Sequence, residues 1–150
     1  MQIPLIALIV AFLGGLAIAL QATLNTFAGK GMGAIPTGLW VNAAGGIISV
    51  AVLLFLRSKS TITLTSVRPF LPMIIAAGAI GIGVIMAVAF ALPKTGLATG
   101  LAIIILGQMF FAVIFDATGI TGIRIPVDMR RILGLIIMTI AIWLLLLGRT

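Results

Sequence analysis

Residues 3–28 read IPLIALIVAFLGGLAIALQATLNTFA, a run without charge. A helix needs about 20 apolar residues to cross the hydrocarbon core of a bilayer, and this run is long enough. On a helical projection the bulky side chains share one face, and the other face carries small residues, among them Gly14 and Gly15, with the amides Gln21 and Asn25. Small residues let membrane helices approach closely, and amides bond across a contact or line a cavity. We therefore predict that the bulky face meets lipid and that the small face looks into a protein interior.

The composition of the whole chain places it in a membrane. Its 150 residues are 63% hydrophobic and 7% charged, against about 25% charged residues in globular domains. The chain has no cysteine and no histidine, and its only acids are Asp116 and Asp128. These absences argue against disulfides, soft metal sites and paired-carboxylate catalysis. We expect a polytopic membrane protein with no catalytic residue, metal or cofactor.

Five segments have the length and apolar character of membrane-spanning helices. They are residues 3–28, 36–56, 70–92, 96–117 and 132–148. Pro36 suits the start of the second span, Pro93 marks the end of the third, and residues 93–95 predict a tight turn. The opening run is too long for a cleavable signal peptide and lacks a basic beginning, so it is expected to be the first span. The predicted fold is an all-α integral membrane protein, with residues 1–150 as one transmembrane domain.

The nine basic residues predict an orientation. The loops after the second and fourth spans carry six of them: Arg57, Lys59, Arg68, Arg124, Arg130 and Arg131. The opposite side carries three: Lys30, Lys94 and Arg149. Cytoplasmic loops are enriched in Lys and Arg, so we predict the N-terminus inside and the C-terminus outside. The net charge of +7 is thus explained by topology, and no nucleic-acid partner is expected.

Glycines on the first four spans predict close helix packing. The candidates are Gly14, Gly15, Gly45, Gly46, Gly83, Gly96, Gly100 and Gly107. In the second span Gly38, Asn42, Gly45 and Ser49 form one small and polar stripe. The fifth span is bulky, with few small residues beyond Gly134, and is expected at the periphery or at an oligomer contact. These patterns indicate close packing and nothing more.

Few side chains could carry a function. Gln21, Asn25, Asn42 and Gln108 are candidates for lining a substrate pathway; the alternative is interhelical hydrogen bonding, worth about 0.6 kcal/mol on average. Asp116 is a candidate for coupling or gating, because acids within membrane spans are often functional. Its alternative is an interfacial ion pair with one of three basic residues, Arg124, Arg130 or Arg131. Asp128 is expected in a solvated pair with an arginine.

Several stretches together resemble a known family. They are Leu20-Gln-Ala-Thr-Leu-Asn25, Leu39-Trp-Val-Asn-Ala-Ala-Gly-Gly46, Gly96-Leu-Ala-Thr-Gly100 and Leu106-Gly-Gln-Met109, continuing to Asp116. The chain resembles the YdcZ-like family of small five-span proteins in the drug/metabolite transporter superfamily. The resemblance implies a bacterial cytoplasmic (inner) membrane protein, half of an inverted-repeat transporter fold that pairs in antiparallel fashion with itself or with a homologous opposite-facing subunit. Such units occur with dual topology, as separate opposite-facing subunits, or fused.

The sequence departs from one pattern of that superfamily. Its small multidrug exporters rely on a carboxylate in the first span, where this chain has Gly14, Gly15 and Gln21. Proton-coupled cation exchange of that kind is therefore in doubt.

Two hypotheses remain from different functional classes. The first is a subunit of an antiparallel dimeric transporter for a small organic solute, because five helices are too few to enclose a pathway and an odd number favours inverted pairing. The alternative is a non-transporting membrane partner or assembly subunit, whose small faces serve helix packing alone. Both hypotheses place the protein in contact with the lipid bilayer.

Overall fold

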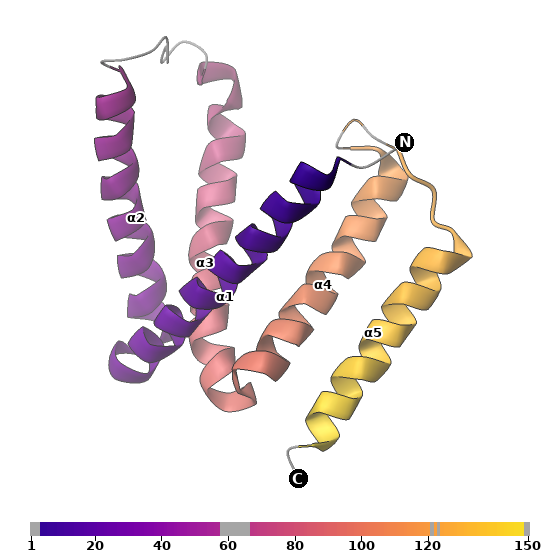
Figure 1. Cartoon of the computed structure of the whole chain (residues 1–150). Helices are drawn as coiled ribbons and strands as arrows, with labels where there is room; N and C mark the ends of the chain where they lie inside the picture. Colours follow the sequence, from indigo (N-terminus) through magenta and orange to yellow (C-terminus); the bar gives the residue numbers. More distant parts are fainter. Residues whose placement is uncertain (1–3, 58–66, 121, 123, 149–150) are drawn as a thin grey trace. The chain divides into compact units, whose positions relative to one another are not determined.

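Helices make up most of the chain. The computed structural model describes residues 4–57, 67–120, 122 and 124–148. Its elements are α1 (Leu5–Met32), α2 (Ala34–Arg57), the short 3₁₀-helix η2 (Arg68–Phe70), α3 (Leu71–Thr95), α4 (Leu97–Thr118) and α5 (Met129–Leu147) (Figure 1). Five of these helical segments are long and apolar enough to cross a membrane. The predicted all-helical fold with five apolar helices is confirmed.

The chain divides into two compact units. Residues 1–94, with α1, α2 and α3, form the first unit, and residues 95–150, with α4 and α5, form the second. The expectation of a single transmembrane domain stays a prediction.

Gly33 alone separates α1 from α2. The helix α1 continues past the predicted limit of residue 28 to Met32, and α2 begins at Ala34. Gly33 has φ +88°, a conformation that residues with a Cβ adopt only with strain, and its N–H donates to the Gly29 carbonyl at 3.0 Å. Pro36 lies in the first turn of α2, where its missing N–H leaves no helical bond unmade. One glycine therefore suffices to reverse the chain.

Pro93 does not end α3, contrary to the prediction. The helix includes Pro93 and runs to Thr95, and the break comes at Gly96, with φ +73° and ψ 157°. That backbone region is essentially restricted to glycine. A proline inside a helix clashes with the carbonyl four residues earlier. Because proline has no N–H, it also leaves that carbonyl without its helical donor. Here that carbonyl belongs to Ala89, and it faces Gly29 of α1, where an added Cβ would lie 2.7 Å from it.

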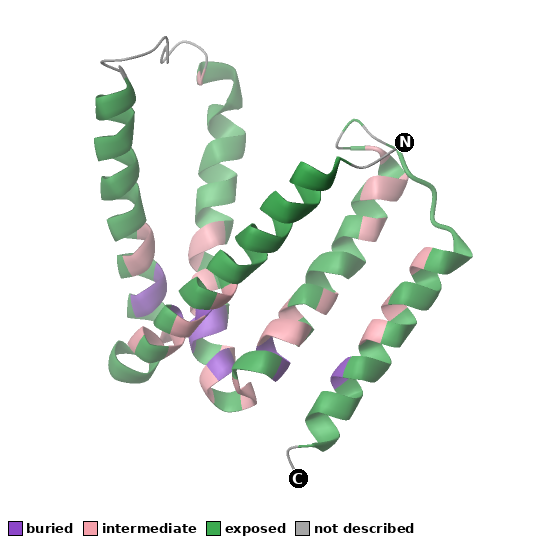
Figure 2. Cartoon of the chain, in the orientation of Figure 1, coloured by how far each residue is buried: buried purple, intermediate pink, exposed green. Residues whose placement is uncertain are grey.

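The packed part of the first unit lies near the turn between α1 and α2 (Figure 2). Its buried residues are Ala22 and Asn25 of α1, Thr37 and Gly38 of α2, and Val88, Ala89 and Leu92 of α3. An added Cβ on Gly38 would lie 3.0 Å from the Ile82 carbonyl oxygen, so α2 also approaches α3 closely. The remaining stretches of these helices are largely exposed. In a bilayer, such apolar surfaces face lipid or other helices.

In the second unit, α4 packs against α5. The helix α4 ends at Gly119, a left-handed residue with φ +71°. The chain then turns back, and the Ile125 N–H donates to the Asp116 carbonyl at 2.9 Å. Asp128 begins α5 as its N-cap, with Oδ1 accepting the Arg131 backbone N–H at 3.0 Å.

The structure therefore changes the expected role of Asp128. Its carboxylate caps α5 through a backbone N–H, where a solvated pair with an arginine side chain was predicted. Aspartate is a preferred N-cap residue because its side chain satisfies a donor that the helix leaves unpaired. The cap also places the start of α5 at Met129, before the predicted residue 132.

Candidate functional site

Asp116 and Arg131 form an ion pair between α4 and α5. Arg131 Nη1 donates to Asp116 Oδ2 at 3.0 Å, and the side chains are 27% and 35% exposed, respectively. Of the three candidate partners for Asp116, the structure thus selects Arg131. The guanidinium of Arg124 instead donates through Nε to the Ala117 carbonyl at 3.2 Å, and Arg130 is exposed.

Both charges lie at helix ends that disfavour them. Asp116 is in the last turn of α4, near the negative end of the helix dipole, and Arg131 is in the first turn of α5, near the positive end. Each charge alone opposes the local field. Their pairing offsets both effects, and the reversal of the chain between Thr118 and Met129 brings the two ends together.

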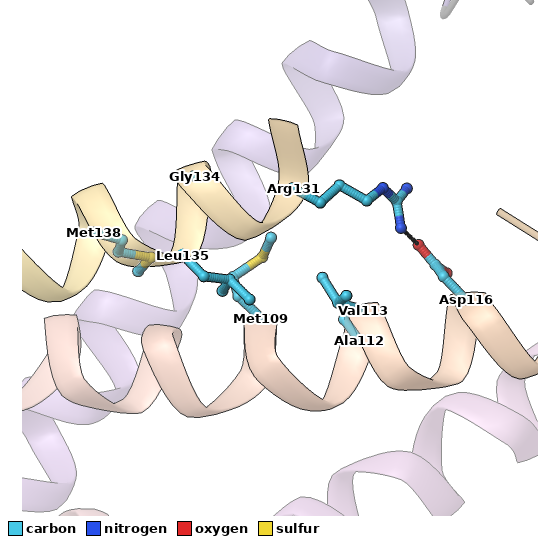
Figure 3. A pocket seen from close by; sticks show the side chains of 8 residues that line it. All are labelled: Met109, Ala112, Val113, Asp116, Arg131, Gly134, Leu135 and Met138. Carbon is cyan, nitrogen blue, oxygen red and sulfur yellow. Dashed lines mark hydrogen bonds and ion pairs between the residues drawn. The ribbon is translucent and has the colours of Figure 1, made fainter. Parts of the chain in front are cut away.

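A pocket of about 290 Å³ extends from this ion pair (Figure 3). It is lined from α4 by Met109, Ala112, Val113 and Asp116, and from α5 by Arg131, Gly134, Leu135 and Met138. On each helix the lining residues span two turns, or about 10 Å along the axis. One end of the pocket is charged, and the rest is apolar.

The pocket stays open because two residues of its lining, Ala112 and Gly134, have little or no side chain to fill it. Ala112 has a single methyl group, and a Cβ added to Gly134 would meet no described atom within 4 Å. In Figure 3 the longer side chains of Met109 and Arg131 lie to either side along the pocket. The pocket therefore depends on the small size of Ala112 and Gly134.

The chemistry available in the pocket is that of binding. It offers one carboxylate, one guanidinium and thioether and aliphatic surface. The described residues include no group of three or more His, Cys, Asp or Glu that could hold a metal ion. The arrangement suits an amphipathic molecule with charge at one end.

The four predicted pathway amides are in different environments. Gln21 and Gln108 are exposed, Asn42 is partly buried, and Asn25 is 4% exposed. Asn42 donates through Nδ2 to the Gly38 carbonyl of its own helix at 2.8 Å. Gln21, Asn25 and Asn42 belong to the first unit, and Gln108 belongs to the second. Their role in lining a pathway stays a prediction.

Most of the candidate packing glycines are open within the described chain. A Cβ added to any of six of them would meet no described atom within 4 Å: Gly14, Gly15, Gly45, Gly46, Gly83 and Gly107. Gly96 forms the break between α3 and α4, and Gly100 is buried. The close approaches occur at Gly29 and Gly38 instead. Gly38 belongs to the stripe recognised in the second span, whereas Gly29 lies beyond the predicted end of the first.

Sequence reasoning missed the contribution of α5 to the pocket. The fifth span was interpreted as bulky, but Arg131, Gly134, Leu135 and Met138 follow i, i+3, i+4 and i+7 and share one helical face. That spacing is the signal that could have found the face. The same spacing relates Met109, Ala112, Val113 and Asp116 on α4.

Comparison with known proteins identifies a family. A family model described as "Putative inner membrane exporter, YdcZ" matches residues 6–144, which reach from α1 into α5. No curated protein and no solved structure matches the chain.

Proposed function

Because the chain belongs to the family described as "Putative inner membrane exporter, YdcZ", we propose that it is a subunit of an antiparallel dimeric secondary transporter that exports a small organic solute. The observation that carries the proposal is the family match over residues 6–144. The five apolar helices agree with a multi-pass protein of that kind.

The open glycines support the pairing of two copies. Six of the eight predicted packing glycines have room for a Cβ against every described atom, although small residues in membrane helices usually serve close contacts. A second copy would supply the missing partners. With five spans the termini lie on opposite sides, so an inverted pair has the two-fold symmetry that many transporters use for alternating access.

Gln21 and Gln108 are the strongest candidates for the pathway lining. Both are exposed amides on predominantly apolar helices, and polar side chains in membrane spans tend to face a bundle interior or a water-filled cavity. Asn25 and Asn42 belong to the same proposal, although the chain already covers most of Asn25. Asp116 is the proposed coupling or gating position.

Cysteine accessibility tests the water-lined pathway. The native chain has no cysteine, so Gln21→Cys and Gln108→Cys each place a single thiol in a clean background. We expect both to react with a membrane-impermeant maleimide, because the reactive thiolate forms in contact with water. Leu20→Cys, on the bulky face beside Gln21, is the matched control and should stay unreactive. If Gln21→Cys and Gln108→Cys react with the maleimide as little as Leu20→Cys does, the pathway assignment is wrong. That result would support a packing role for the small faces.

The transport proposal requires a solute. It can be identified by comparing the culture medium of cells that produce the protein with that of cells that do not. Gln108→Ala and Asp116→Asn should then each slow the release of that solute. Undiminished export by both variants would contradict the roles of these two residues, and the absence of any released solute from a verified dimer would favour the non-transporting alternative.

A further inference from the structure

We propose that the pocket between α4 and α5 is a binding site for a phospholipid with a primary ammonium headgroup, that is, a phosphatidylethanolamine. The headgroup lies against the Asp116–Arg131 pair, and the first part of an acyl chain lies along the apolar lining. This inference goes beyond solute export and does not rest on it.

The charges at the mouth of the pocket match a zwitterion. The carboxylate and the guanidinium are 3.0 Å apart, and both are partly exposed. A guanidinium has five N–H donors and a carboxylate has two acceptor oxygens, whereas the ion pair joins one nitrogen, Nη1, to one oxygen, Oδ2. A phosphate can therefore accept from Arg131 while a neighbouring ammonium donates to Asp116.

The same pair discriminates against other headgroups. An anionic headgroup without an amine would bring its phosphate beside the Asp116 carboxylate, and it has no ammonium group of its own to offset that repulsion. A trimethylammonium headgroup has no N–H to donate to that carboxylate. A headgroup with a primary ammonium offers a counter-charge to each member of the pair, because its ammonium donates to Asp116 and its phosphate accepts from Arg131. Both of these bonds are charge-assisted.

The ion pair lies at the ends of the two helices, where a lipid headgroup would be expected. Asp116 and Arg131 lie in the last turn of α4 and the first turn of α5, where the chain leaves two apolar helices. Arginine side chains near such ends reach toward the headgroup level. Toward the middle of the helices, the lining is formed by Met109, Leu135 and Met138. The polar end and the apolar end are thus ordered as in a phospholipid.

The size of the pocket suits part of a lipid. Its volume of about 290 Å³ lies just below the range of small-molecule sites, which is about 300–1,000 Å³. It can take the region around the phosphate and the first carbons of one chain, while the rest of the lipid stays in the bilayer.

Native mass spectrometry of the purified full-length protein tests the proposal. The protein is released from detergent in the presence of phosphatidylethanolamine, phosphatidylcholine or phosphatidylglycerol with identical acyl chains. We expect about tenfold stronger retention of phosphatidylethanolamine, the loss expected when one charged hydrogen bond is missing. Asp116→Asn should remove the preference over phosphatidylcholine, and Arg131→Gln should lower retention of all three lipids. Arg130→Gln, which removes the same charge from the neighbouring exposed position, is the control and should bind like the wild type.

A steric variant tests the pocket without changing its charges. Gly134→Leu fills the space between α4 and α5 and should reduce retention of phosphatidylethanolamine, whereas Thr139→Leu, outside the lining, should not. Circular dichroism of each variant reports whether it is folded, so Gly134→Leu tests the site even where Asp116→Asn fails to fold.

Three outcomes would overturn the inference. The first is equal retention of phosphatidylethanolamine and phosphatidylcholine by the wild type. The second is a preference for phosphatidylglycerol, which would mean that arginines alone select the lipid. The third is displacement of the lipid by water-soluble glycerophosphoethanolamine at equal concentration, which would identify a site for a soluble solute.

Discussion

Asp116 and Arg131 show how two unfavourable placements become a favourable one. A carboxylate at the C-terminal end of α4 and a guanidinium at the N-terminal end of α5 each oppose their own helix dipole. At 3.0 Å each supplies the counter-charge that the other helix end requires. Because both side chains are partly exposed, the pair is expected to contribute modestly to stability.

A double-mutant cycle measures this contribution. Asp116→Asn and Arg131→Gln should show a coupling free energy of about 0.2–1 kcal/mol, the range of exposed ion pairs. The measurement is the free energy of unfolding in mixed micelles with increasing denaturing detergent. The cycle of Asp116→Asn with Arg130→Gln is the control and should give a smaller coupling. Equal coupling in the two cycles would contradict the specific pair.

Gly29 and Gly31 make a second comparison between single residues. Gly29→Ala should lower the free energy of unfolding by about 1–3 kcal/mol, the usual effect of overpacking, because the new Cβ would lie 2.7 Å from the Ala89 carbonyl oxygen. Gly31→Ala, in the same helix with no described atom within 4 Å, should be neutral or stabilising by about 0.5–1 kcal/mol. The same unfolding assay checks both variants, and equal effects would contradict a close approach of α1 to α3.

At the scale of the elements, two of the connections between α-helices consist of a single glycine. Gly33 joins α1 to α2, and Gly96 joins α3 to α4, each with a positive φ. The one-residue connection at Gly33 leaves α1 and α2 little freedom in how they meet at this turn. The longer connection between α4 and α5 works differently, because Gly119, Arg124 and Asp128 each satisfy backbone groups at the helix ends.

Gly96→Ala tests the glycine turn. A residue with a Cβ at φ +73° and ψ 157° is strained by about 1–3 kcal/mol, so the variant should unfold at correspondingly lower detergent fraction. Gly78→Ala, inside α3 and in open space, is the control and should not be destabilised. An unchanged midpoint for Gly96→Ala would indicate that the turn can adopt another backbone conformation.

For the whole molecule, the question is how copies are oriented in the membrane. The six-to-three distribution of basic residues favours the N-terminus inside, but the proposed dimer needs copies in both orientations. A modest bias is compatible with dual insertion, because the positive-inside rule depends on the difference in Lys and Arg between the two sides. A homologous opposite-facing subunit would meet the same need.

Paired C-terminal reporters, active on opposite sides of the membrane, measure the orientation. The wild type should signal mainly outside. The double variant Arg124→Gln and Arg130→Gln, which lowers the distribution to four against three, should raise the inside signal. Lys30→Gln should have the opposite effect, because it increases the bias. If neither the double variant nor Lys30→Gln changes the ratio of the two reporter signals, the basic residues do not set the orientation of this chain.

Sequence alone determined the class of the protein. Hydrophobic runs of sufficient length and scarce charge lead to five apolar helices, because a spanning helix satisfies its backbone internally and needs only apolar side chains outside. The family was also readable from local stretches, such as residues 20–25 and 39–46. Helix ends were less accurate: Gly29 and Pro93 suggested endings, yet the helices continue through both residues.

The tertiary structure decided which side chains meet. Local spacing placed Asp116 near three arginines, and only the return of the chain into α5 selected Arg131. It also decided that Gly29 and Gly38 lie close to α3, whereas a Cβ added to Gly14 or Gly45 would meet no described atom within 4 Å. The physical reason is that periodicity defines the faces of a helix, whereas a pocket or a close approach depends on the register of two helices. That register follows from turns such as Gly33 and Gly119 and from the packing that they permit.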